Sequence, residues 1–554
     1  MEDEAHAHRP CDNGDRLRHP SGAAQPGIFV GNRGHGEPSC PHRREQRIDR
    51  RQHRIPPDDP DIPGSGKSNL LEVLAAIFFQ LEVLRVRRSF LPDNFLFDQA
   101  DNPKGFKDGD GVPNGFEIEY LIRVPGAFRK AESPLLAHVR IIKTLGNSPE
   151  ISWLNQTEFA IDVLDAVSER EREFLLPQYV LGYSSGGNEI LSLPFFQMRF
   201  IQFDEYWNAL TKQLPYPGRP ETRLAYLDSS FSQAILLCNL LFHDAEMLRP
   251  FREDVGIEAL REFRIIIRRS IQLDPAQLDA FDGSDESQRH ERVNRIKADN
   301  RNDTEAQILD RIRAEIVKSN QALWIDEDND SVTRYRLNLM HGLEGDDSSS
   351  LMVSALKRCA TCSYLDEVTD TLYLDYHVND ATKEAFKENF GYSPITLFQA
   401  LQVLLTLNLY SVSDALKADL YRSDSLYVGE TIPTLASDQR IMRIKNFWLK
   451  KAEVEEPVLL KSLSDGEHQL LHTLGLSLLF RNTNSLFLLD EPETHFNPDW
   501  RACFATRVRQ CFHGSEDSHE VLITTHTPFL ISDSKPENVL VIQQRQGNKA
   551  GDRQ

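Results

Sequence analysis

The chain of 554 residues is long enough for roughly two or three domains and a large hydrophobic core. Its composition, 40% hydrophobic and 27% charged, is that of a globular protein, and its net charge of −21 excludes a chain that coats nucleic acid by charge alone. It has no run of about 18 apolar residues and no apolar stretch after its N-terminal charges, so we expect no transmembrane helix, no signal peptide and no membrane partner. Its seven cysteines are too sparse for a disulfide scaffold, and we expect a cytoplasmic protein.

Residues 1–63 differ in composition from the rest of the chain. They contain no Lys, Trp or Tyr, they are rich in Arg, His and Pro, and only GIFVG at 27–31 is apolar enough for a short strand. Such a segment cannot bury a core. It is either a natural disordered tail or a mis-translated segment, from a wrong start or reading frame, with native sequence resuming near Gly64. We favour the second explanation.

From Gly64 onward the pattern becomes that of a folded domain. Residues 67–88 are predicted to form a strongly apolar helix. Residues 116–124 and 134–145 alternate between apolar and polar side chains, as half-buried strands do. Residues 150–250 combine helix and strand signals.

Residues 250–325 are predicted to be mainly helical and highly charged. Within them Arg261, Arg264 and Arg268 have the spacing of one helix face. That face is either simply solvated, which we favour, or a contact for DNA. No heptad pattern is sustained, which argues against a long coiled coil.

The segment after residue 455 alternates helices with apolar strands. The helix GEHQLLHTLGLSLLF precedes the strand SLFLLD, and the helix WRACFATRVRQCF precedes the strand EVLITT. Continuous apolar strands separated by helices are typical of a parallel sheet that is buried on both faces.

The stretch GSGKSN at 64–69 has the form of a nucleotide-binding P-loop. Gly64 and Gly66 allow backbone N–H groups to surround phosphates, and the following helix adds the positive end of its dipole. Lys67 is expected to reach the β- and γ-phosphates, and the Ser68 hydroxyl to bind Mg²⁺. The alternative is a Gly-rich turn that caps a core helix.

The stretch SLFLLDEPETHFNPD at 485–499 has the form of a Walker B strand. A buried strand of a parallel sheet presents its C-terminal carboxylates at the edge where ligands bind. We expect Asp490 to hold Mg²⁺ and Glu491 to polarise the attacking water. An acidic strand-to-loop turn would explain a lone Asp-Glu pair but explains DEPE after LFLL poorly.

Two further motifs accompany these. In LITTHTPFL at 522–530, His526 follows a β-branched strand, as a sensor of the γ-phosphate would. Taken alone, it is more simply a histidine at a strand end. In KSLSDGEHQLL at 461–471, Ser464 and Gly466 precede a helix whose N-terminus would bind a second anion.

The order and spacing of the four motifs resemble the ABC-type ATPase heads of the SMC, DNA-repair and OLD-like families. Their signature LSxGE corresponds to residues 463–467, their Walker B to 486–492, their switch histidine to His526, and their GKSN ending includes Asn69. More narrowly, GYSSGGNE at 182–189 and LSDGEHQ resemble bacterial restriction-system-associated AAA-family ATPases. The resemblance implies an α/β fold, a P-loop NTPase of ABC type with a parallel sheet core and a large, mainly helical insertion.

The resemblance also implies a site shared by two copies of the chain. ATP and Mg²⁺ would lie between the P-loop of one copy and the signature loop of the other, in a head-to-head homodimer. Glu491 and His526 would be the catalytic residues, and Ser68 and Asp490 the metal ligands. The nucleotide-binding residues implied are Gly64, Ser65, Gly66, Lys67, Ser68, Asn69, Ser464, Gly466 and Glu467.

The front of the P-loop departs from the family pattern. Asp61 stands where a glycine is expected, Pro63 stands where an asparagine is expected, and no apolar strand precedes them. Proline also removes one N–H group from the phosphate cradle. The match becomes good at Gly64, and such a sharp boundary favours a wrong start or reading frame before it over gradual divergence. As written, the chain is expected to bind nucleotide weakly and to lack one or two strands of the head.

The long gap between P-loop and signature defines the predicted domain organisation. The insertion grows out of the head and is placed at 205–440. The head is formed by 64–204 and 441–554, with 1–63 outside it.

Three lesser features of the sequence have weaker functional implications. CATC at 359–362 is a single CxxC without a second pair, so a zinc site is unsupported. YSSGGNE at 183–189 superficially copies a signature loop but lies far too early, and is expected to be a functional or structural loop. Gln197 and Gln202 are candidates for the glutamine that senses Mg²⁺ in such heads.

The expected function is ATP binding and hydrolysis that gates a DNA-acting nuclease or restriction partner in defence against foreign DNA. A DNA-repair or chromosome-structuring ATPase is one alternative, although the lack of heptads argues against its long arm. A scaffold that binds ATP without turnover is the other.

Overall fold

The structure is a computed structural model, and the chain divides into two compact units. Unit 1 comprises Met1–Leu74, Asn114–Asn188 and Asp465–Gln554, and unit 2 comprises Ala75–Pro113 and Glu189–Ser464. The structure describes residues 28–29, 67–86, 113–129, 134–159, 167–220, 222–282, 286–299, 304–326, 333–344, 352–413, 416–417, 432–515 and 517–541.

Unit 1 contains a parallel sheet whose strands lie in the order β1–β16–β15–β5. These are β1 (Ile28–Phe29), β16 (His519–Thr524), β15 (Ser485–Asp490) and β5 (Tyr179–Ser184). All six residues of β15 are buried, as expected for a central strand covered on both faces. The parallel sheet predicted for the C-terminal segment is therefore present, and this mixed α/β architecture is compatible with a P-loop domain.

The short strand β1 lies at one end of this order. It pairs with β16 in parallel, Ile28 opposite Val521 and Phe29 opposite Leu522. It falls within GIFVG, the one stretch of the first 63 residues that was apolar enough for a strand. The other predictions for residues 1–63 lie outside the described residues.

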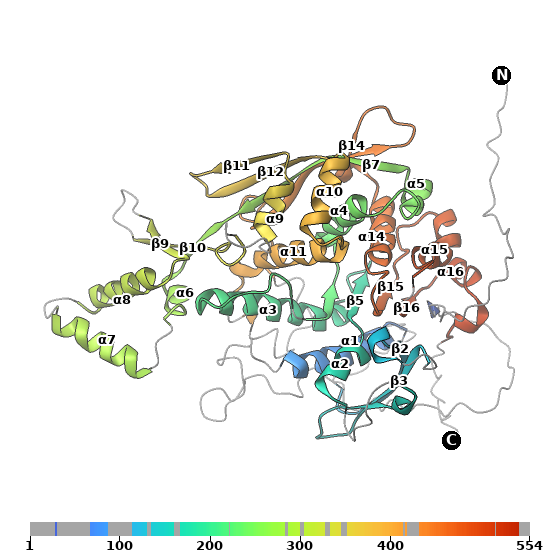
Figure 1. Cartoon of the computed structure of the whole chain (residues 1–554), viewed down its shortest axis with the longest axis horizontal. Coiled ribbons are helices and arrows are strands. Elements are labelled where there is room, and N and C mark those ends of the chain that lie inside the picture. The colour runs from blue at the N-terminus through green and yellow to red at the C-terminus, as the bar shows by residue number, and fades with distance from the viewer. Residues whose placement is uncertain are drawn as a thin grey trace, which may run out of the picture. The chain divides into compact units, whose positions relative to one another are not determined.

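Helices precede and follow the strands of this sheet along the chain (Figure 1). Asn497 caps α15 through a bond from the Trp500 N–H to its side chain, and Pro498 fills the first helical position. The helices are α2 (Glu169–Leu175), α14 (Asp465–Leu479), α15 (Pro498–Cys511) and α16 (Pro528–Ser532), and α1 (Lys67–Val86) begins in unit 1.

A second, antiparallel sheet in unit 1 confirms the two alternating segments. Its strands are β2 (Phe116–Arg123), β3 (Leu136–Lys143) and β4 (Glu150–Trp153), in that order. Every second residue of β3 is buried, which is the period of a strand with one face in the core.

Unit 2 is built on a five-stranded antiparallel sheet in the order β11–β12–β7–β13–β14. Helices α4, α9, α10 and α11 lie along one side of it in Figure 1, and α4, α9 and α11 contact its strands. The strands are β7 (Ile257–Arg268), β11 (Cys362–Asp366), β12 (Thr371–His377), β13 (Met442–Lys451) and β14 (Val458–Leu459). The helices are α3 (Glu189–Thr211), α4 (Ser232–Phe242), α5 (Arg249–Val255), α9 (Met352–Cys359), α10 (Asp380–Asn389) and α11 (Pro394–Thr406).

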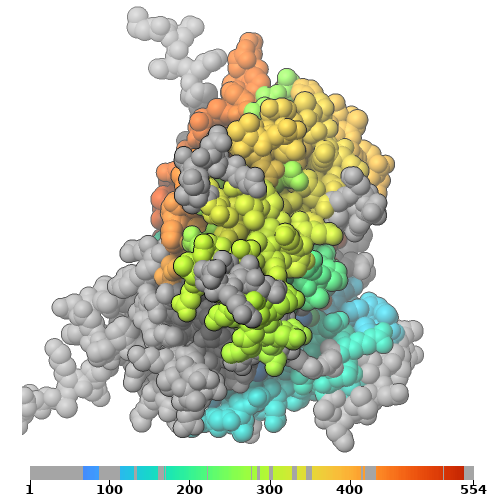
Figure 2. Space-filling model, turned by 90° about the vertical axis from the view of Figure 1, so that its left-hand side faces the viewer, coloured from blue at the N-terminus to red at the C-terminus, as the bar shows by residue number. Residues whose placement is uncertain are grey.

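A smaller layer of unit 2 carries a charged helical pair. Helices α7 (Glu286–Asp299) and α8 (Glu305–Ser319) pack together, and their yellow-green atoms face the viewer in Figure 2. Ion pairs such as Arg295 with Glu315 connect them. The remaining elements are α6 (Pro275–Asp279), β6 (Leu224–Tyr226), and the antiparallel strands β8 (Ser270–Leu273), β10 (Arg334–Asn338) and β9 (Leu323–Asp326).

One prediction for this region is wrong, the helix face formed by Arg261, Arg264 and Arg268. Residues 257–268 form a strand, because β12 and β13 pair with this segment on its two sides. Arg264 and Arg268 therefore share one face of β7 while Arg261 points to the other, and Arg264 pairs with Asp375 at 2.6 Å. The segment 205–440 contains the strands β7, β11 and β12 of the central sheet of unit 2 in addition to its helices.

Across the described ranges, no single helix is long and apolar enough to cross a membrane. One bent pair, Asp380–Asn389 with Pro394–Ser411, is long and apolar enough to cross a membrane, but only if its two helices are taken together. Seven of the side chains of α11 from Leu397 to Leu404 are buried in the protein.

Candidate active site

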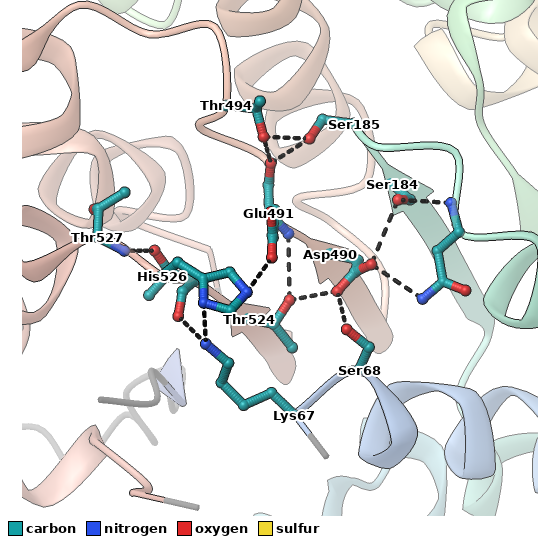
Figure 3. Close-up of polar contacts among 12 residues, drawn as sticks. Lys67, Ser68, Ser184, Ser185, Asp490, Glu491, Thr494, Thr524, His526 and Thr527 are labelled. Atoms are coloured by element: carbon teal, nitrogen blue, oxygen red, sulfur yellow. Dashed lines mark hydrogen bonds and ion pairs between the residues drawn. The ribbon is translucent and has the colours of Figure 1, made fainter. Parts of the chain in front are cut away.

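The candidate site lies in unit 1, where three parallel strands end side by side. Asp490, the last residue of β15, is opposite Thr524 of β16 and Ser184 of β5. Its carboxylate accepts hydrogen bonds from Ser68 Oγ at 2.8 Å, Thr524 Oγ1 at 2.5 Å, Asn188 Nδ2 at 3.1 Å and Ser184 Oγ at 3.4 Å. Four donors from three chain segments thus fix its orientation (Figure 3).

Glu491 adopts a backbone conformation that is rare for a residue with a side chain. Its φ is +49°, in the left-handed region. Its N–H donates to the carbonyl oxygen of Thr524 at 3.1 Å, and the hydroxyls of Ser185 and Thr494 donate to its own carbonyl oxygen. Neighbouring segments therefore hold the strained turn, a feature common at functional sites.

His526 lies between a lysine and a carboxylate. Its Nε2 is 2.7 Å from Oε1 of Glu491, and its Nδ1 is 3.0 Å from Nζ of Lys67. Lys67 Nζ also donates to the carbonyl oxygen of Thr525 at 2.7 Å. Because a lysine ammonium can only donate, Nδ1 must accept and Nε2 carries the proton that is donated to Glu491.

The electrostatics of the site are dominated by partial burial and by the carboxylates. Burial lowers the pKa of Lys67, while the nearby charges of Glu491, Glu493 and Asp490 oppose that shift. Burial raises the pKa of Glu72, one turn after Ser68 on α1. The Glu72 carboxylate accepts a bond from Asn188 Nδ2, which thus bridges Glu72 and Asp490.

The loop after β5 supplies functional side chains that were not predicted as site residues. Ser184, Ser185 and Asn188 come from GYSSGGNE, which was noted only as a functional or structural loop. The available signal was its place directly after an apolar strand, since strand ends of a parallel sheet share one edge. Gln202, by contrast, donates to the Thr222 hydroxyl in the core of unit 2.

Of the predicted P-loop residues, the structure describes those from Lys67 onward. Gly64, Ser65 and Gly66 lie outside the described residues. Lys67 and Ser68 begin α1, and Asn69 is exposed on its first turn.

The signature residues lie at the start of α14. Ser464 is exposed just before the helix, and Glu467 is half-buried in its first turn. Gly466 is buried against the loop that follows Glu491, because a Cβ placed on it would lie 2.6 Å from the carbonyl oxygen of His495. Gln469, one turn later, accepts a bond from the His495 N–H at 2.9 Å.

Comparison with protein families bears on this site. Residues 263–532 match the family model described as "AAA domain, putative AbiEii toxin, Type IV TA system". The match supports an AAA-type P-loop ATPase. The matched range begins at Phe263 in β7 and includes Asp490, Glu491 and His526, but it does not include Lys67. No curated protein matches the chain.

An AAA-type ATPase domain indicates nucleotide binding, and the chain's own geometry agrees with that indication. The Lys67 and Ser68 side chains, which lie outside the matched range, contact the matched residues His526 and Asp490. The start of α1 and the C-terminal part of the matched range thus contribute side chains to a single cluster in unit 1.

Proposed function

We propose that the protein binds and hydrolyses ATP at the cluster formed by Lys67, Ser68, Asp490, Glu491 and His526. The observation that carries this proposal is the meeting of the P-loop and Walker B side chains, with Ser68 Oγ 2.8 Å from Asp490 Oδ1. These residues are far apart in the sequence, and their side chains are of the types that bind phosphate, hold a metal ion and activate a water molecule.

The start of α1 supports phosphate binding. A 20-residue helix presents unpaired N–H groups and a positive dipole end at its N-terminus, and Lys67 adds a full positive charge there. Phosphate oxygens would replace His526 Nδ1 and the Thr525 carbonyl as the acceptors of Lys67.

Ser68 and Asp490 fit a Mg²⁺ ion bound together with ATP. A hydroxyl and a carboxylate oxygen are hard ligands of the kind that Mg²⁺ prefers, with waters and phosphates completing the shell. The bound ion would neutralise charge on the β- and γ-phosphates. The hydroxyls of Thr524 and Ser184 keep the Asp490 carboxylate turned toward Ser68.

Glu491 is proposed as the general base. It would take a proton from a water whose oxygen attacks the γ-phosphorus, as the bond from that phosphorus to ADP breaks. His526 Nε2–H orients the Glu491 carboxylate and, once the γ-phosphate is present, would donate to the charge that develops there.

A second copy of the chain would complete the site. Ser464, Gly466 and Glu467 lie at the start of α14, and the proposal places them on the nucleotide held by another copy. ATP would then join two heads, and hydrolysis would release them. With hydrolysis blocked by Glu491→Gln, light scattering should detect an ATP-dependent dimer, and adding Lys67→Ala should abolish it.

The biological role proposed is gating of a DNA-acting nuclease or restriction partner in defence against foreign DNA. The description of the matching family names a putative toxin of a type IV toxin–antitoxin system, and this supports a role in such a system or in defence. A DNA-repair or chromosome-structuring ATPase and a scaffold without turnover remain the alternatives. Expression in cells with and without phage challenge separates a defence role from a repair role.

The decisive test is ATP turnover. Glu491→Gln should lower kcat by about 100-fold or more, since general-base catalysis is worth about that much, while ATP still binds. The matched control is Glu456→Gln, an exposed carboxylate in the turn before β14. The same assay on the variant Asp61→Gly/Pro63→Asn tests whether the two atypical residues before Gly64 lower ATP turnover. Absence of turnover in both the unchanged chain and this variant would overturn the enzyme proposal in favour of a scaffold.

A further inference from the structure

Glu493, the second glutamate of DEPE, has a buried side chain with no role in the scheme above. The residue is 1% exposed, although it lies in the loop between β15 and α15. Its Oε1 accepts a hydrogen bond from the Thr525 hydroxyl, and its Oε2 has no hydrogen-bond partner among the described residues. A carboxyl group is costly to bury, so this placement calls for a reason.

The two glutamates of DEPE hold adjacent residues of one turn. Glu491 contacts the ring of His526 at 2.7 Å, and Glu493 holds the hydroxyl of Thr525. The left-handed backbone at Glu491, followed by the fixed φ of Pro492, lets side chains two positions apart reach the same dipeptide.

Thr525 is fixed on three sides. Its hydroxyl oxygen accepts a bond from the Thr527 N–H at 3.0 Å, which leaves its one hydrogen for Glu493. Its carbonyl oxygen accepts from Lys67 at 2.7 Å. Thr525 is 0% exposed, so removal of Glu493 would leave its buried hydroxyl without an acceptor and free the turn that carries His526.

The loop that carries Glu493 is itself anchored. Arg501 on α15 donates to the carbonyl oxygens of Glu493 at 3.3 Å and Thr494 at 2.8 Å. The glutamate backbone is thus fixed independently of its side chain, so a change confined to the side chain should not displace the loop.

We propose that Glu493 is a positioning residue that fixes the Thr525–His526 turn, and through it the contact between His526 and Glu491. The proposal rests on the ATPase function proposed above. Glu493 does not touch the reacting atoms, and it acts on them only through Thr525. The hydrogen bond joins Glu493 to the Thr525 hydroxyl, so it can be removed by mutating either residue.

Paired variants test the proposal by turnover. Glu493→Leu and Thr525→Val remove the hydrogen bond and nearly keep side-chain volume, whereas Glu493→Gln and Thr525→Ser keep it. Burial raises the pKa of Glu493, so a neutral glutamine is the conservative replacement. We expect kcat to fall at least tenfold in the first pair and less than threefold in the second, with KM for ATP changing less than threefold in all four.

The ring nitrogens of His526 provide a readout that needs no turnover. In protein labelled at its 17 histidines, NMR signals that disappear in His526→Gln belong to this residue. We expect a single Nε2–H form in the unchanged chain, and exchange-broadened or shifted signals in Glu493→Leu and Thr525→Val. The two conservative variants should keep the unchanged spectrum.

The two readouts separate failure of the proposal from failure of the proposed function. If neither the unchanged chain nor the Asp61→Gly/Pro63→Asn variant hydrolyses ATP, the enzyme proposal fails while the His526 signals still decide the role of Glu493. Unaltered His526 signals in folded Thr525→Val and Glu493→Leu, with kcat within threefold where turnover exists, would overturn the proposal. Thr525→Val keeps the test valid even if Glu493→Leu fails to fold.

Discussion

Nε2 of His526 lies 2.7 Å from Oε1 of Glu491, and the side chains of both residues are partly open to solvent. Since Lys67 donates to the opposite ring nitrogen, the histidine is held in one tautomer between a cation and a carboxylate. The His526 ring is therefore preorganised, and each side chain that orients it can be replaced separately by mutation.

Loss of the His526 ring should reduce turnover more than binding. His526→Gln removes a donor aimed at Glu491 and at the expected γ-phosphate, and loss of one such donor typically costs about 100-fold in kcat. The affinity for ATP, measured with a fluorescent analogue, should change far less. A variant with unchanged kcat would remove His526 from the proposed scheme. His513→Gln, at an exposed position, serves as the control.

Asn188 should control the Mg²⁺ requirement. Its Nδ2 bridges Asp490 and Glu72, so Asn188→Ala would leave two carboxylates facing each other without a shared donor. Residues that orient a metal ligand typically change metal affinity by about 10-fold or more when mutated. We expect turnover to need about tenfold more Mg²⁺. Titration of activity against Mg²⁺ measures this, with the exposed Asn147→Ala as control.

Gly466 should be needed for folding as well as for any contact with a second copy. An added Cβ would lie 2.6 Å from the backbone carbonyl of His495, which cannot move without displacing the loop after Glu491. Such overpacking typically costs about 1–3 kcal/mol in the free energy of unfolding. Gly115→Ala is the matched control, because its Cβ would meet the Lys143 carbonyl oxygen at 3.5 Å. Equal unfolding midpoints for the two variants would contradict the prediction.

His519 should make the protein less stable in mild acid. The residue is buried at the start of β16, its ring 4.3 Å from that of Phe512, and burial lowers its pKa to about 4. In the unfolded chain it takes up a proton near pH 6.5. The unfolded state thus binds more protons between these values, so this contribution to stability is complete above pH 6.5 and falls as the pH drops toward 4.

The size of this effect can be measured against a variant. Between pH 7.5 and 5 the unchanged chain should lose about 2 kcal/mol more unfolding free energy than His519→Gln, by the linkage of proton uptake to unfolding. Denaturant unfolding of both proteins at the two pH values provides the comparison. Parallel losses in the two proteins would show that His519 titrates in the folded state as it does in the unfolded one.

Local sequence patterns anticipated the central elements of unit 1. An uninterrupted apolar run ending in Asp490 and Glu491 predicts a buried parallel strand with carboxylates at its end, and the structure has such a strand at Ser485–Asp490. The alternating run at 116–124 similarly predicted β2. These patterns are readable because burial of a strand on one or two faces dictates its residue types directly.

The elements that local pattern misread were decided by partners distant in sequence. Arg261, Arg264 and Arg268 have helical spacing, yet β7 became a strand because β12 and β13 pair with it on both sides. Tertiary pairing of this kind overrides local spacing.

The sequence by itself determined that this chain has a parallel sheet ending in Asp490 and Glu491 and an apolar helix beginning at Lys67. Only the tertiary structure decided that Ser184 and Asn188 bond to Asp490, and that Glu493 accepts a hydrogen bond from Thr525, the residue before His526. The reason is physical: residue types within a segment indicate whether it is buried as a strand or helix, whereas a hydrogen bond between loops depends on which distant segments the fold brings side by side.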